Sequence, residues 1–327
     1  MRKLLFIVPV VLLTCALSPE AKAKRIIENG LEDESKTVRV AAARGLAGID
    51  RERSARILSD MLTDADPAVR AAALAALIPH SAQSTELSAA LKDLCRDPRP
   101  AVRVAAYRNV AAALDTAAKD LLVSGLEDES ARVREVAYAA LVRFEERDLL
   151  RAGLRDRDPL VRIASARALG LLGVAGMSDY MGEEMKRLPP DVLGPAIIMY
   201  AELGDTAVLG QLRVLVREAA GELRVDVGEA LLILNDRAGV EALENSMESN
   251  DPFVRIRATS VLTRHDVPAL RARLEAATRD DYVTVAMQAV QALAEHDAEN
   301  YKNLFAELME APKPLLRIAA AAAFLRN

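Results

Sequence analysis

The side chains that could act as metal ligands or nucleophiles are few and widely separated in this sequence. Three histidines occur, His80, His265 and His296, and none of them is followed by glutamate. A metal centre needs several such ligands at close spacing, so we predict neither a metal site nor another cofactor. The sequence also has no glycine-rich phosphate-binding motif and no Gly-x-Ser-x-Gly nucleophile motif.

Two pairs of adjacent carboxylates are further candidates for acid–base chemistry, Glu145-Glu146 and Glu183-Glu184. Neighbouring residues of a helix point about 100° apart, so such pairs do not converge on one substrate. We interpret them as solvated surface charge and predict no catalytic residue.

The composition indicates which elements would have to position any site. Hydrophobic residues make up 51% of the 327 residues and aromatic residues only 3%, and the apolar mass is Ala, Val and Leu. This balance is typical of a helical protein. With 43 basic and 48 acidic residues the net charge is -5, which argues against a nucleic-acid partner.

The first residues resemble an export signal. Met1-Arg2-Lys3 is basic, residues 4–13 are apolar, and Ala21-Lys22-Ala23 has the small-x-small form of a cleavage site. The apolar run is shorter than the ~20 residues that cross a bilayer. We therefore predict a signal peptide over residues 1–23, a mature domain over residues 24–327, and export to the periplasm or cell envelope.

Cys15 offers an alternative way of processing this leader. It follows Leu12-Leu13-Thr14, which resembles a bacterial lipobox, although threonine is a poor fit where Gly, Ala or Ser is usual. Lipidation at Cys15 and cleavage near Ser18 or Ala23 therefore stay open as alternatives. A lipid on Cys15 would be the protein's sole contact with a membrane.

The rest of the sequence is one unit repeated about ten times. Segments such as DADPAVRAAALAAL and DESARVREVAYAAL share an acidic turn, a Val-Arg pair and a run of small residues. One anchor residue of each unit recurs from residue 38 to residue 316 at a mean spacing of about 31. The anchors are Val38, Val69, Val102, Val133, Val161, Val192, Leu223, Val254, Tyr282 and Leu316. Such a period indicates helix pairs stacked as a solenoid, although the ninth unit fits only with a longer turn.

This D-x-x-x-x-V-R-x-A-A pattern resembles the HEAT-like repeats of the phycobilisome-lyase type, over nearly all of residues 24–327. The resemblance implies an all-α HEAT-like solenoid, a superhelix in which the second helix of each pair lines the concave side. It is specific for architecture and not for activity. The His-Glu dyads with which HEAT-repeat deoxyhypusine hydroxylases hold iron are absent. Cys95 takes a position that Leu or Met holds in other units, so we interpret it as a buried thiol.

The resemblance also gives a structural role to recurrent charged residues. In HEAT-like repeats, an aspartate five residues before the anchor and an arginine one residue after it link successive units by hydrogen bonds, each contributing about 1.5–3 kcal/mol. The matching residues are Asp33, Arg39, Asp64, Arg70, Asp97, Arg103, Asp128, Arg134, Asp156 and Arg162. The pattern fails in the sixth unit, where prolines and glycines gather. We expect either a joint near residues 172–200 or ordinary degeneracy of the repeat.

Residues on the second helices form a candidate groove for a partner. They are Arg44, Tyr107, Arg108, Tyr138 and Arg167. Aromatic and arginine side chains are common anchors of protein interfaces, but the same residues could simply pack between adjacent helices.

The last unit ends without a polar capping helix, so we expect one continuous rod whose C-terminal repeat self-associates. Together these features predict an exported, non-enzymatic protein-binding scaffold of a bacterial cell envelope that uses its concave surface. The alternative is a lyase- or chaperone-like protein that handles a tetrapyrrole or another hydrophobic ligand.

Overall fold

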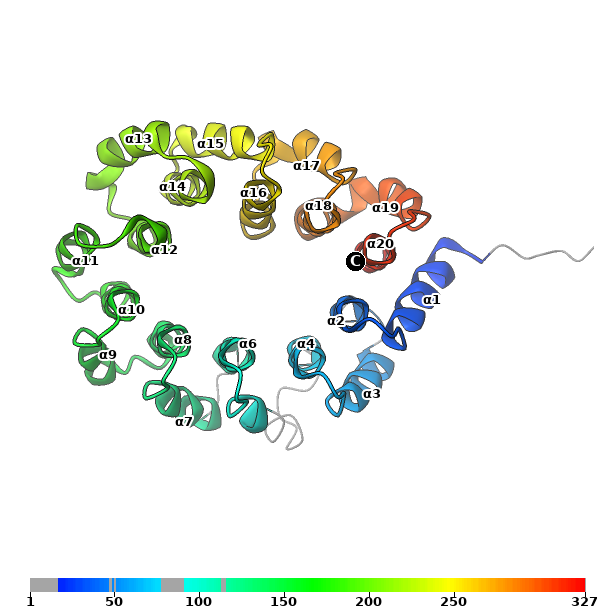
Figure 1. The fold of residues 1–327 in the computed structure, drawn as a ribbon, viewed down its shortest axis with the longest axis horizontal. Helices are drawn as coiled ribbons and strands as arrows, with labels where there is room; N and C mark the ends of the chain where they lie inside the picture. The colour runs from blue at the N-terminus through cyan, green and yellow to red at the C-terminus, as the bar shows by residue number, and fades with distance from the viewer. Residues whose placement is uncertain (1–16, 47–48, 50, 78–90, 113–115, 327) are drawn as a thin grey trace, which may run out of the picture.

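A computed structural model describes residues 17–46, 49, 51–77, 91–112 and 116–326 of the chain. These residues form α-helices joined by short turns, and no strand occurs among them. The all-α solenoid that the repeat predicts is therefore confirmed (Figure 1). None of the described helices is long and apolar enough to cross a membrane.

The helices lie in two layers, with the first helix of each unit outside and the second inside (Figure 1). The outer helices are α1 (Pro19–Leu31), α3 (Arg51–Met61), α7 (Thr116–Gly125), α9 (Arg147–Gly153), α11 (Met177–Met185), α13 (Leu209–Glu218), α15 (Arg237–Met247), α17 (Arg271–Ala277) and α19 (Lys302–Leu308). The inner helices are α2 (Lys36–Gly45), α4 (Pro67–Leu77), α6 (Pro100–Ala112), α8 (Ala131–Leu141), α10 (Pro159–Leu171), α12 (Pro190–Ala201), α14 (Gly221–Ile233), α16 (Pro252–Arg264), α18 (Val283–Asp297) and α20 (Pro314–Phe324).

Two of the inner helices, α10 and α16, begin at an aspartate cap. Asp158 accepts hydrogen bonds from the backbone N–H groups of Leu160 and Val161, at 2.9 and 3.4 Å. Asp251 accepts from Phe253 in the same way. A proline follows each aspartate at the first helical position, where its missing N–H leaves no bond unmade.

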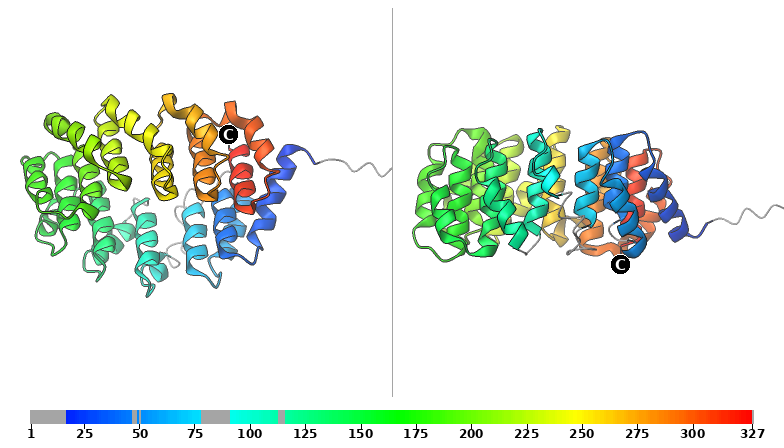
Figure 2. Two further views of the ribbon diagram at one scale, coloured as in Figure 1. Left: turned by 45° about the horizontal axis from the view of Figure 1, so that its top comes forward. Right: turned by 90° about the horizontal axis from the view of Figure 1, so that it is seen from below.

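The solenoid closes on itself. Helix α20 packs against both α1 and α2, so the last unit meets the first and the helix pairs form a ring (Figures 1 and 2). One apolar cluster runs through this seam and includes Ile27 and Ile318. The expected rod is therefore wrong, because the small rotation from each unit to the next adds up to a full turn.

The seam repeats the packing found inside the ring. Tyr107 and Tyr138 each lie over a glycine of the following unit, Gly125 and Gly153, where a Cβ would come within 2.6 Å of the ring. At the seam, Gly30 receives Ile318 in the same manner. The first unit thus covers the face of the last one. The expected self-association through the C-terminal repeat is not supported, because that face is already buried within the chain.

The ninth anchor is a correction to the repeat register. Tyr282 lies at the end of a turn and is 49% exposed, whereas Val285 is buried. Asp280 stands five residues before Val285, as Asp33 stands before Val38. The sequence pattern selects the wrong anchor because Tyr282 and Val285, which lie three residues apart, both fit the apolar position.

The predicted joint near residues 172–200 stays a prediction. The core is divided there, since Ile163, Met181 and Ala196 belong to one apolar cluster and Ile197 and Leu231 to another. Elsewhere the described core is continuous around the ring.

Candidate functional site

The charged residues of the turns form a series of contacts that we call the turn ladder. Arg39 Nε and Nη2 donate to the carboxylate of Asp64 in the next unit, at 2.9 and 3.2 Å. Its Nη1 donates to the backbone carbonyls of Asp33 and Glu34 in its own unit. Asp64 also accepts the backbone N–H of Asp66. One arginine therefore fixes its own turn and the position of its neighbour.

The turn ladder runs through the first half of the ring and returns later. Arg103 reaches Asp128 and Arg134 reaches Asp156, with Nε–Oδ2 distances of 2.8 Å in both pairs. The Arg70–Asp97 pair is looser, at 3.8 Å. Two pairs were not predicted, Arg162 with Glu184 and Arg255 with Asp280. Asp33 has no preceding unit beside it in sequence, and its carboxylate accepts the N–H of Ser35.

Hydrogen bonds set the protonation of these carboxylates. Burial alone would raise the pKa of Asp156, but the bonds from Arg134 and from the backbone N–H of Asp158 hold that pKa below its ordinary value. The same balance lowers the pKa of Asp64. Asp64 and Asp156 are therefore ionised at neutral pH, and the turn ladder serves as a structural link between units.

A second set of charges links α14 to α16 on the inner layer, and we call these the inner pairs. Asp226 accepts hydrogen bonds from Arg257 Nε and Nη2, at 2.8 and 2.6 Å. Glu229 accepts from both nitrogens of the Arg264 fork and lies 3.0 Å from His265 Nε2. Sequence reasoning missed these residues. The available signal was the carboxylate of Asp226, three residues after the anchor, where five of the other nine units have alanine.

The two buried carboxylates of the inner pairs have opposite pKa shifts. Burial raises the pKa of Asp226, because Arg257 contacts only one of its oxygens. Burial by itself would also raise the pKa of Glu229. Hydrogen bonds from His265 and Arg264 outweigh burial, so the pKa of Glu229 is lowered. Gly194 of α12 makes room for Asp226, since a Cβ on Gly194 would lie 2.0 Å from Asp226 Oδ2.

The five predicted groove residues do not form one surface. Tyr107 and Tyr138 are buried against the following unit, and the Tyr107 hydroxyl lies 3.1 Å from Ser124 Oγ. These two residues belong to the core, which agrees with the packing alternative and not with the groove. Arg167 forms an ion pair with Glu202. Arg108 and Arg44 are exposed.

Arg44 lies at the edge of a hollow in the inner layer, across the seam. We call this feature the inner hollow; its volume is about 570 Å³. Helices α2, α18 and α20 contribute its lining. Its apolar lining residues, which we call the floor, include Val40, Ala41, Ile318, Ala319 and Ala322, and its polar lining residues, which we call the rim, are Thr37, Arg44, Thr284, Gln288, Gln291 and Arg326. Arg326 is paired with Glu295, whereas no ion pair to Arg44 is found among the described residues.

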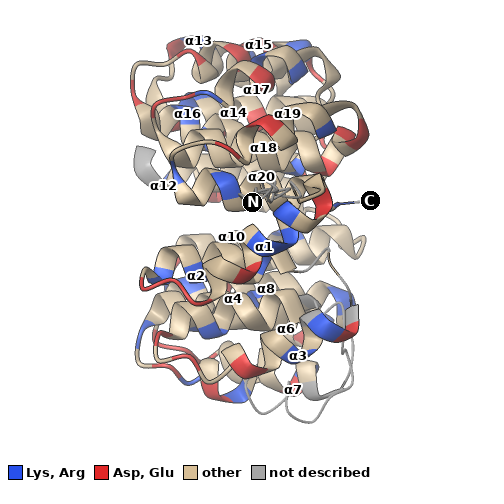
Figure 3. Cartoon of the chain, turned by 90° about the vertical axis from the view of Figure 1, so that its right-hand side faces the viewer, with Lys and Arg blue, Asp and Glu red and all other residues tan. Residues whose placement is uncertain are grey.

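No group of three or more potential metal ligands occurs among the described residues. Cys95 is buried, and burial raises the pKa of its thiol to about 12, so the reactive thiolate is scarce at neutral pH. His80 and Cys15 lie outside the described residues. Viewed from the seam, the positions of basic and acidic residues are interspersed along the chain (Figure 3).

Comparisons with known proteins agree with this geometry. The family model for HEAT repeats matches residues 23–96 and 87–170. Residues 23–170, less than half of the chain, therefore match HEAT repeats, and the described residues as a whole form an all-α solenoid of stacked helix pairs. The sequence has no match among curated proteins.

Several solved structures resemble the chain at low identity. Human deoxyhypusine hydroxylase in complex with glycerol is 18% identical, with 84% of this chain and 95% of that chain covered and a TM-score of 0.40. The CpcE–CpcF complex of phycocyanin lyase from Nostoc sp. PCC7120 is also 18% identical, with 75% and 94% covered and a TM-score of 0.45. Kap95p, in a structure with RanGDP, is 14% identical, with 94% and 50% covered and a TM-score of 0.40. At these identities the likeness concerns the fold alone.

Proposed function

We propose that this chain is a non-enzymatic protein-binding scaffold that holds an apolar segment of a partner in the inner hollow. The observation that carries the proposal is the hollow itself, with an apolar floor and one exposed cation, Arg44, at its edge. Apolar pockets with a few polar groups at the rim are the usual form of binding sites.

The chemistry of the hollow indicates what the partner segment carries. Its floor of Ala, Val and Ile side chains favours apolar side chains. Arg44 would pair with a carboxylate of the partner, either acidic side chain or chain terminus. Gln288 and Gln291 of α18 and the threonines can donate to and accept from backbone amides. We therefore propose an apolar polypeptide segment with one acidic group.

The proposed place of action is the bacterial cell envelope. The basic start of the chain, the apolar residues 4–13 and the small-x-small motif support export, and Cys15 supports a lipid anchor as one form of it. Fractionation of cells that express the full chain tests this part. Recovery with cytoplasmic markers would contradict it.

Site-specific photo-crosslinking tests the hollow. A photoreactive residue would replace half-buried Ala322 in the floor, and a matched one would replace Val214, which is exposed on the outer helix α13. We expect one defined polypeptide to attach at residue 322 and not at residue 214. Mapping of the crosslinked peptide should find an acidic group within an apolar stretch.

Arg44→Glu is the companion variant. Arg44 is exposed, so its replacement should leave the thermal unfolding temperature nearly unchanged, while crosslinking at residue 322 falls at least tenfold, as expected for the loss of a charged contact. Equal crosslinking at both positions, or crosslinking indifferent to Arg44→Glu, would reject the proposal. A coloured or lipid-like small molecule in the hollow would favour ligand handling instead.

A further inference from the structure

Helix α1 starts at Pro19, two residues before the cleavage motif Ala21-Lys22-Ala23. Ser18 is its N-cap: Ser18 Oγ accepts the N–H of Ala21 at 3.2 Å, and the Ser18 carbonyl accepts the N–H of Lys22 at 2.9 Å. Pro19 occupies the first helical position. A serine cap followed by proline is a strong helix start, so the local sequence at Ser18 is suited to a folded domain.

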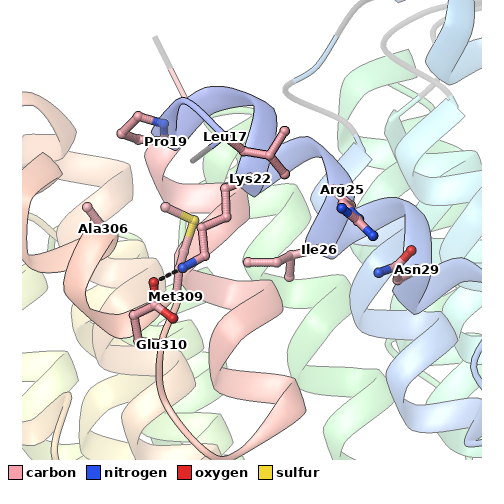
Figure 4. A pocket seen from close by; sticks show the side chains of 9 residues that line it. All are labelled: Leu17, Pro19, Lys22, Arg25, Ile26, Asn29, Ala306, Met309 and Glu310. Carbon is pink, nitrogen blue, oxygen red and sulfur yellow. Dashed lines mark ion pairs between the residues drawn. The ribbon is translucent and has the colours of Figure 1, made fainter. Parts of the chain in front are cut away.

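The first turns of α1 also take part in closing the ring. Ala23 is fully buried, and Lys22 forms an ion pair with Glu310 of the last unit. Leu17, Pro19 and Lys22 line a hollow of about 560 Å³ together with Ala306, Met309 and Glu310, from across the seam (Figure 4). Residues before and within the motif Ala21-Lys22-Ala23 are therefore part of the contact between the two ends of the solenoid.

Cleavage after Ala23 would damage this contact. Water would add across the Ala23–Lys24 peptide bond, leaving a carboxylate on Ala23 and an ammonium group on Lys24. The serine cap, the proline and the Lys22–Glu310 pair would be lost together. The new ammonium group would lie at the positive end of the helix dipole, beside the side chains of Lys24 and Arg25, which is unfavourable.

We infer that residues 18–23 remain in the mature protein, and that a leader peptidase cuts the chain upstream of Ser18. The motif Ala21-Lys22-Ala23 is then a structural segment whose small residues allow α1 to approach the last unit. This inference moves the start of the folded domain from Lys24 to Ser18, and it does not depend on what the inner hollow binds.

The mature N-terminus is the direct test. The full-length chain is expressed in a bacterial host, purified from the fraction where it accumulates, and measured by intact mass and by tryptic peptides. We expect an intact mass below that of the full chain and a peptide that contains Ser18, ends at Lys22 and starts at a residue that does not follow lysine or arginine. An uncleaved chain, which would give residues 4–22, would contradict the inference. A chain whose first residue is Lys24 would overturn the inference.

Two further measurements test the same inference in other ways. Ala21→Arg in the full chain blocks recognition of the small-x-small motif, and we expect the mass to change only by the substitution; an altered cleavage position would contradict the inference.

Hydrogen exchange on the purified full chain should show protected amides over residues 22–31, as in an interior helix. Amides that exchange at the rate of an unfolded peptide would overturn the role of this segment in closure.

Discussion

The turn ladder and the inner pairs join neighbouring units with the same residue types in different surroundings. In the ladder both partners are enclosed: the side chains of Arg134 and Asp156 are 5% and 10% exposed. In the inner pairs only the carboxylate is enclosed, since Asp226 is 8% exposed and Arg257 35%. Arg134 also donates to two carbonyls of its own turn, at 2.9 and 3.2 Å, whereas no such second role is found for Arg257 among the described residues.

This difference shows what decides the cost of burying a carboxylate. Asp156 accepts hydrogen bonds on both oxygens, and its pKa is lowered despite burial. Asp226 accepts on one oxygen while the other faces Gly194, and burial raises its pKa. The number of donors, and not the presence of an arginine, separates a carboxylate that favours its charge from one that opposes it.

Removal of a ladder arginine should have the largest effect on stability. Arg134→Ala leaves Asp156 without its partner in a closed site, so the free energy of unfolding should fall by about 3–5 kcal/mol. Urea unfolding followed by circular dichroism measures the change. Arg70→Ala is the control, because Arg70 is more exposed and 3.8 Å from Asp97; it should cost about 1 kcal/mol or less. Equal losses would show that enclosure does not determine the strength of the ladder.

The Asp226–Arg257 pair should tolerate replacement of both residues better than replacement of one. Arg257→Met alone strands the buried Asp226 carboxylate and should cost roughly 2–4 kcal/mol, less than a fully enclosed pair because Arg257 is partly solvated. Asp226→Leu with Arg257→Met removes both charges and should cost under about 1 kcal/mol. A double variant as unstable as the single one would mean that the pair has a further role.

Glycine replacement tests whether α12 depends on its contact with Asp226. Gly194→Ala forces the buried Asp226 side chain to move and should lower stability by roughly 1–3 kcal/mol. Gly182→Ala in α11 meets no atom within 4 Å and should raise stability by about 1 kcal/mol through helix propensity. Thermal unfolding of the two variants provides the comparison, and a stabilising Gly194→Ala would refute the close approach.

The smallest expected effect is a difference in acid sensitivity. Asp64 has a lowered pKa, so its stabilising contribution is present above the ordinary aspartate pKa and is lost as pH falls towards the folded-state value. Asp226 has a raised pKa, so its contribution is present at low pH and is lost as pH rises through the folded-state value. Asp64→Asn should make the loss of stability on acidification shallower, and Asp226→Asn should make it steeper. Urea midpoints from pH 7 down to below the ordinary aspartate pKa of about 3.9 would show this, and slopes that shift the same way would contradict it.

Particular residues show how far sequence reasoning reached. The positions of Arg39, Arg103 and Arg134 were predicted with their acidic partners, because both members recur at a fixed distance from the anchor. Tyr107 and Tyr138 were left undecided between groove and packing, because their position on the helix lies at the boundary between the exposed stripe and the contact with the next unit. A glycine in the following unit decides that boundary, and its effect appears only when the two helices are packed.

The sequence by itself determined the helices, the period of the repeat and the regular part of the ladder, because each depends on residues within one unit or its nearest neighbour. Tertiary structure decided the ring, the inner hollow and the inner pairs. Closure depends on a small rotation repeated over all units, and no local pattern encodes that sum. The seam, where Gly30 receives Ile318, joins residues from opposite ends of the chain, so its geometry exists only once every unit between them has folded.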